Sequence, residues 1–118
     1  MGHVYKEIKL SWVEERKLKV LVDTGATFAV VPPELAEEIG MPRSGKRWFK
    51  VRLANGEEVQ AETGSVIITI GGREAPATAI ILEGAEPLLG VEALEGLGLK
   101  VNPNTGELEP TRSYIIRA

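Results

Sequence analysis

Residues 19–32, KVLVDTGATFAVVP, constrain the fold more than any other stretch of the chain. An apolar run carries the backbone into a carboxylate, Asp23, then through Thr-Gly-Ala-Thr and out through a second apolar run. Asp23 is the only Asp in the sequence, because every other acidic side chain is Glu. Short apolar runs that flank a glycine turn are typical of buried strands. The stretch therefore predicts a β-fold that holds a single carboxylate at a turn.

Length and composition indicate a single folded domain, which we assign to residues 1–118. Hydrophobic residues make up 43% and charged residues 26% of the sequence, as in ordinary globular proteins. The net charge of −3 offers no basic surplus for nucleic acid or an anionic membrane, so we expect neither as a partner. Since no stretch reaches the ~18 apolar residues of a membrane span and the N-terminus lacks a signal-peptide core, we expect a cytoplasmic protein.

The residues that are absent narrow the chemistry further. The sequence has no Cys, which excludes thiol nucleophiles and thiolate metal sites. Its only His is His3, close to the N-terminus, so a Ser-His-acid triad is disfavoured. We predict no metal site and no cofactor.

The remaining patterns predict further strands and two short helices. Asn55-Gly56 lies between alternating runs and predicts a long central hairpin. The helices are expected at 33–40, with Pro33 in the first turn and a glycine stop, and at 91–97. Strands are expected on both sides of the Val-Glu-Glu-Arg turn at 13–16, at 28–31, around Gly71-Gly72, before Gly90, around the turn within 102–110, and at 112–118.

This order of motifs resembles the retropepsin-like aspartic proteases. The resemblance rests on Leu-Val-Asp-Thr-Gly-Ala-Thr at 21–27, the short helix after it, the central hairpin and Pro-Leu-Leu-Gly at 87–90. It implies an all-β fold, a closed acid-protease barrel-like domain with one or two short helices that forms a homodimer. The hairpin at about 48–62 would be the flap that closes over a peptide. A strand at about 112–118 would lie at the dimer interface.

The chemistry of the carboxylate leads to the same dimer. Hydrolysis of a peptide bond by carboxylates needs two of them close together that share one proton. A chain with one Asp supplies such an Asp pair only when two copies meet across a twofold axis. We therefore predict an aspartic endopeptidase that acts on a peptide or protein substrate, with one Asp23 from each subunit.

The candidate site residues follow from their chemistry and from the resemblance. Thr24 would hold the two loops together across the dimer by its hydroxyl, and Gly25 would permit a backbone geometry that a side chain obstructs. The small side chain of Ala26 would allow the partner loop to approach. The predicted catalytic residues are Asp23, Thr24 and Gly25, and the predicted substrate-binding residues are Ala26, Leu21, Val30, Ala54, Asn55, Gly56 and Leu88.

Several alternatives stay open at this stage. The better-known viral members have Arg and then Asn or Asp after the later Gly, whereas Val91 and Glu92 follow Gly90 here. The chain could therefore be a weakly active or inactive dimer that binds peptides or assists assembly. It could also be a monomer in which Asp23 only caps its own turn. We expect Trp12 and Trp48 to be packing residues.

Overall fold

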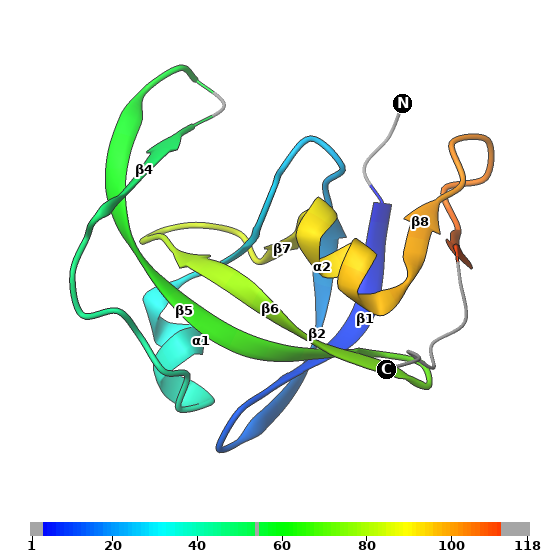
Figure 1. The fold of residues 1–118 in the computed structure, drawn as a ribbon, viewed down its shortest axis with the longest axis horizontal. Coiled ribbons are helices and arrows are strands. Elements are labelled where there is room, and N and C mark those ends of the chain that lie inside the picture. Colours follow the sequence, from blue (N-terminus) through cyan, green and yellow to red (C-terminus); the bar gives the residue numbers. More distant parts are fainter. Residues whose placement is uncertain (1–3, 54, 112–118) are drawn as a thin grey trace, which may run out of the picture.

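The computed structural model describes residues 4–53 and 55–111, which form two sheets and two short helices (Figure 1). The elements are β1 (Val4–Ser11), β2 (Glu15–Val22), β3 (Ala29–Val31), α1 (Pro33–Glu38), β4 (Phe49–Arg52), β5 (Glu58–Ile70), β6 (Arg73–Ile81), β7 (Leu88–Leu89), α2 (Val91–Leu97), β8 (Leu99–Val101) and β9 (Leu108–Pro110). The predicted strand at 112–118 lies outside the described residues.

The main sheet closes on itself. Its strands follow the order β1-β2-β7-β3-β6-β5-β4, and β1 also pairs with β5 through Lys9–Ser11. Six strands therefore make a ring, and β4 extends from it beside β5 alone. The prediction of a closed all-β domain with one or two short helices is confirmed. In the described part of the chain, neither helix has the length and apolar character that a membrane crossing requires.

One face of each strand supplies the core. In β6 the alternation of apolar and polar residues buries Ala75, Ala77 and Ala79, and α2 packs against this strand. Alanine side chains are small, so the helix can lie close to the sheet. The larger fully buried side chains are Leu10, Ile39, Ile68, Leu89, Leu97, Val20, Val31 and Val66.

The central hairpin forms where the Asn-Gly signal predicts it. Strand β4 pairs with β5 from Phe49 opposite Ala61 to Arg52 opposite Glu58. As local structure the hairpin is confirmed, but β5 does not stop at its base. It continues as one strand of 13 residues from the hairpin into the barrel, whereas the sequence suggested two separate strands (Figure 1).

The two tryptophans were predicted wrongly. Trp12 is 46% exposed and Trp48 is 61% exposed. Trp12 lies in the tight turn between β1 and β2, where its amide donates a hydrogen bond to the Glu14 carbonyl oxygen. Trp48 precedes β4 on the side of the hairpin that extends from the barrel, so no second layer covers it.

Candidate active site

Asp23 follows the last residue of β2 and lies beside β7. Strand β2 runs parallel to β7, with Leu21 opposite Leu88 and Val22 opposite Leu89. The Asp23 amide then donates a hydrogen bond of 2.9 Å to the carbonyl oxygen of Leu89. Two strands that are far apart in the sequence thus fix the backbone of Asp23.

The carboxylate of Asp23 is held within its own turn. Its Oδ1 accepts a hydrogen bond of 2.9 Å from the Gly25 amide, and the Ala26 amide donates to the Asp23 carbonyl oxygen at 3.1 Å. Asp23 is partly exposed, while Thr24 and Gly25 are exposed. The turn therefore fixes the orientation of the carboxylate and still presents it at the surface, where a second molecule can reach it.

The space around Gly25 explains how a side chain there would obstruct the site. Its backbone does not occupy the left-handed region, so conformational freedom is not what selects glycine here. A Cβ at this position would instead lie 3.2 Å from Oδ1 of Asp23. The missing side chain leaves space beside the carboxylate.

Gly90 supports the loop of residues 23–28, which we call the Asp loop. A Cβ on Gly90 would lie 2.6 Å from the carbonyl oxygen of Ala26 and 2.7 Å from that of Phe28. The first amides of α2 also bind this loop. The Val91 amide donates to the Ala26 carbonyl oxygen at 2.8 Å, and the Glu92 amide donates to the Thr27 carbonyl oxygen at 2.9 Å. These contacts satisfy helix N-terminal amides that have no partner inside the helix. The sequence marked Gly90 as part of a motif, but not this role.

Glu92 joins the start of α2 to β6. Its Oε1 accepts a hydrogen bond of 2.8 Å from the Thr78 amide, in a partly buried setting. Although the viral Arg contact is absent, the residues after Gly90 therefore still fasten the Asp loop and the sheet together. The sequence analysis missed this role of Glu92, which a lone Glu in a first helical turn does not reveal.

The predicted pocket walls come together in the structure. Leu88 of β7 is the pairing partner of both Leu21 in β2 and Val30 in β3. All three side chains are partly exposed, unlike their fully buried neighbours. They form a small apolar group, and its β2 member, Leu21, is two residues before Asp23.

The predicted hairpin-tip residues, 54–56, belong to a different part of the sequence from the apolar group of Leu21, Val30 and Leu88. Gly56 has a left-handed φ of 89°, and its amide donates to the Leu53 carbonyl oxygen at 2.9 Å. The Asn55 side chain caps the turn by accepting a hydrogen bond of 2.9 Å from the Glu57 amide. Ala54 lies outside the described residues. The hairpin and the Asp loop project toward the same side of the molecule (Figure 1).

Two depressions border the Asp loop. One of ≈ 500 Å³ contains Asp23 and Thr24 and extends to the turn at 102–106 and to Val4. The other, of ≈ 530 Å³, lies between Phe28 and the base of the central hairpin. There Phe28 meets Phe49 edge-on with ring centroids 5.7 Å apart, and Phe49 meets Trp48 at 5.1 Å. An aromatic contact thus joins the Asp loop to the hairpin.

Charged groups near the site are few. The Glu86 carboxylate, which accepts a hydrogen bond from the Tyr5 hydroxyl, raises the pKa of Tyr5, and Tyr5 pairs with Leu21 across β1 and β2. Within the part of the chain that the structure describes, no three His, Asp or Glu side chains group so that they could hold a metal ion.

Comparisons with known proteins agree with this arrangement. The family model described as "gag-polyprotein putative aspartyl protease" matches residues 12–96. The EIAV protease bound to the inhibitor HBY-793 superposes with a TM-score of 0.63 and 21% identity, over 86% of this chain and 93% of that chain. A retropepsin-like aspartic protease from Rickettsia conorii gives a TM-score of 0.64 and 25% identity, over 86% of this chain and 77% of the other.

A comparison with curated proteins found no match. The family model spans more than half of the chain and includes the Asp loop, Gly90 and most of α2. The solved structures share the overall fold of this chain. The chain therefore belongs to the family of gag-polyprotein putative aspartyl proteases and has the retropepsin-like fold.

Proposed function

We propose that the protein is an aspartic endopeptidase whose water is activated by two Asp23 carboxylates, one from each subunit of a homodimer. The observation that carries the proposal is the presentation of Asp23 at the surface of a turn that is fastened from both sides. A single Asp per chain supports the twofold arrangement.

In this mechanism one carboxylate is ionised and the other is protonated, because like charges about 3 Å apart do not both ionise. The ionised group takes a proton from water, and the water oxygen attacks the peptide carbonyl. The protonated group donates a hydrogen bond to the carbonyl oxygen and stabilises the negative charge that develops there. The carboxyl group that took the proton from water then passes it to the amide nitrogen as the C–N bond breaks, and no covalent intermediate forms.

The neighbouring residues position these groups. The Gly25 amide bond at 2.9 Å orients the Asp23 carboxylate. Thr24 is exposed next to it and would meet its counterpart across the twofold axis. Leu21, Val30 and Leu88 would contact apolar side chains of an extended peptide close to the cleaved bond. The central hairpin would cover the peptide and reduce its contact with bulk water.

A second candidate function is peptide binding without efficient turnover. It is favoured by the polar hairpin tip, where the Asn55 side chain is used to cap its own turn. It is also favoured by the replacement of the viral Arg after Gly90 with Val91. The dimer would then bind peptides while Asp23 contributes only to the turn.

The test measures mass in solution and cleavage of an unstructured protein at acidic and neutral pH. Wild type, Asp23→Asn and the control Glu34→Gln, an exposed carboxylate on α1, would be compared. We expect a dimer in all three and cleavage only in wild type and the control. Cleavage by Asp23→Asn would exclude the mechanism, and a wild-type dimer that cleaves nothing would favour the binding function. A wild-type monomer would exclude the shared pair. A cytoplasmic location stays a prediction that cell fractionation would test.

A further inference from the structure

The segment at 41–48, which connects α1 to β4, lies against the other strand of the central hairpin. The Ser44 amide donates a hydrogen bond to the Thr63 carbonyl oxygen at 2.8 Å, and the Ser65 amide donates one to the Pro42 carbonyl oxygen at 3.3 Å. Arg43 and Gly64 form an isolated β-bridge between these contacts. The connecting segment is therefore fastened to β5 just where this strand leaves the barrel for the hairpin.

Gly64 makes this close approach possible. A Cβ at this position would lie 2.6 Å from both Cε of Met41 and the carbonyl oxygen of Pro42. The connecting segment thus runs directly over the backbone of β5.

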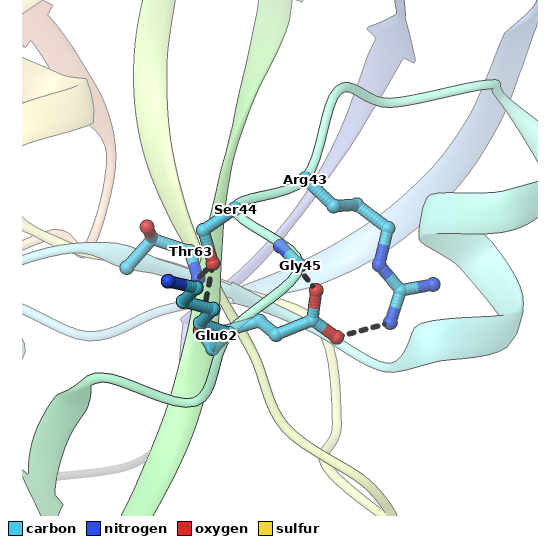
Figure 2. Close-up of polar contacts among 6 residues, drawn as sticks. Arg43, Ser44, Gly45, Glu62 and Thr63 are labelled. Atoms are coloured by element: carbon cyan, nitrogen blue, oxygen red, sulfur yellow. Dashed lines mark hydrogen bonds and ion pairs between the residues drawn. The ribbon is translucent and has the colours of Figure 1, made fainter.

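Glu62 holds the segment from the neighbouring position of β5. One carboxylate oxygen accepts a hydrogen bond of 2.6 Å from Arg43, and the other accepts one of 3.0 Å from the Gly45 amide (Figure 2). The Glu62 side chain is only 16% exposed, whereas the other hairpin ion pair, Arg52 with Glu58, is 73% and 53% exposed. A partly buried, two-pronged carboxylate contact constrains the backbone more than an exposed pair does.

Thr63 and Ser44 extend the same cluster toward the aromatic residues. The Ser44 hydroxyl accepts a bond of 3.2 Å from the Thr63 amide, as Figure 2 shows, and Trp48 donates to the Thr63 hydroxyl at 3.3 Å. Trp48 contacts Phe49, and Phe49 contacts Phe28 on the Asp loop. A continuous set of contacts therefore leads from Glu62 to the loop that carries Asp23.

We propose that Glu62 is a positioning residue: its contacts with Arg43 and Gly45 fix the base of the central hairpin relative to the Asp loop, and so set how tightly a peptide is bound. This inference rests on the proposed protease function for its kinetic consequence. Among the strands of the described residues, β4 pairs only with β5, so the direction of the hairpin depends on its base. Without the Glu62 contacts the base would open more often.

The contact has a defined dependence on pH. The Arg43 hydrogen bond, with the Gly45 amide and the charges of Arg43 and Arg47, lowers the pKa of Glu62 although burial opposes this. Across the adjoining depression the further charged group is Glu83. Because its pKa is lowered, the Glu62 carboxylate stays ionised into moderately acidic solution. Its contacts with Arg43 and Gly45 weaken only as pH falls through this lowered value.

The first experiment needs no activity: hydrogen exchange of residues 42–52 in wild type, Glu62→Gln, Arg43→Gln and the control Glu58→Gln. We expect exchange about tenfold faster in Glu62→Gln, because a bond to a charged group is lost, and a smaller increase in Arg43→Gln, which keeps the Gly45 bond. Glu58→Gln should match wild type. Equal exchange in all four proteins would overturn the proposal, whether or not the protein cleaves peptides.

The second experiment follows peptide cleavage from pH 3 to 7, a range of about four units that spans the ordinary carboxyl pKa. We expect Glu62→Gln to raise KM about tenfold at neutral pH with little change in kcat, since a mispositioned hairpin weakens binding throughout the reaction. The two KM values should converge at the acidic end. A KM that matches Glu58→Gln at every pH would refute the positioning role, while absence of cleavage in wild type would count against the proposed function only.

Discussion

Gly90 lies against the carbonyl oxygens of Ala26 and Phe28, so closely that a Cβ would be 2.6 Å from the first and 2.7 Å from the second. The start of α2 therefore packs directly beneath the Asp loop, with no side chain between them. The Val91 amide also donates a hydrogen bond to the Ala26 carbonyl oxygen, so the helix and the loop are joined through their backbones. Changes on the helix side should thus reach the carboxylate through the backbone.

Gly90→Ala is expected to destabilise the fold strongly. The added methyl group has to displace backbone atoms, and overpacking of this kind costs about 1–3 kcal/mol or more. Thermal or denaturant unfolding at fixed protein concentration would measure the loss. Gly96→Ala, in the same helix, is the matched control, because its Cβ would meet its nearest atom at an ordinary 3.6 Å. Equal stability of the two variants would contradict the contact.

Gly25→Ala is expected to impair catalysis more than folding. The new Cβ would lie 3.2 Å from Oδ1 of Asp23, so the carboxylate has to shift by a few tenths of an ångström. We expect kcat to fall by about tenfold or more, because small misplacements of a catalytic group are costly. The free energy of unfolding should change by less than about 1 kcal/mol.

Gly72→Ala serves as the control for this kinetic measurement, since a Cβ there would meet nothing within 4 Å. It should retain full activity. A Gly25→Ala protein with unchanged kcat would show that the space beside Asp23 is not needed for turnover.

Glu92→Ala is expected to destabilise the protein by about 1–3 kcal/mol, because the Thr78 amide loses its acceptor in a partly buried place. Glu92→Gln should recover most of this, since the amide oxygen can still accept the bond. Denaturant unfolding of both variants measures the difference. If the glutamine variant were as unstable as the alanine variant, the charge rather than the hydrogen bond would be what matters.

The stability of the protein should depend on pH through Glu62. Its pKa in the folded state is lowered from an ordinary value of 4.5, chiefly by Arg43, so its contribution is fully present above that value. It is lost as pH falls through the lowered folded-state pKa. The difference in free energy of unfolding between wild type and Glu62→Gln should be constant near neutral pH and shrink in more acidic solution. A difference that grows on acidification would contradict this sign.

Local features of the sequence predicted several elements correctly. Asn55-Gly56 specified the hairpin, because few other residues adopt the left-handed φ that Gly56 has. Pro33 and the left-handed Gly40 bounded α1 in the same way. The apolar runs on both sides of Asp23 correctly indicated strands that lead into and out of a turn. All of these depend on interactions between residues close together in the chain.

Other features depended on the packing of distant segments. Nothing in the sequence around Leu10 indicated that β1 would pair with β5 and close the barrel. Trp12 and Trp48 carry aromatic side chains that usually pack, but the turn and the extended hairpin leave them at the surface. Whether a side chain is covered is decided by what lies on top of it, and local sequence does not contain that information.

The sequence by itself determined which reactive side chains are available: a single Asp, no Cys, and a glycine turn between apolar runs. Only the tertiary structure decided what holds the loop around Asp23 and the central hairpin in place. The contacts of Gly90 with the Asp loop, of Glu92 with Thr78 and of Glu62 with Arg43 each join residues far apart in the chain. Their physical basis is close packing and the pairing of partly buried polar groups, which exist only after the chain has folded.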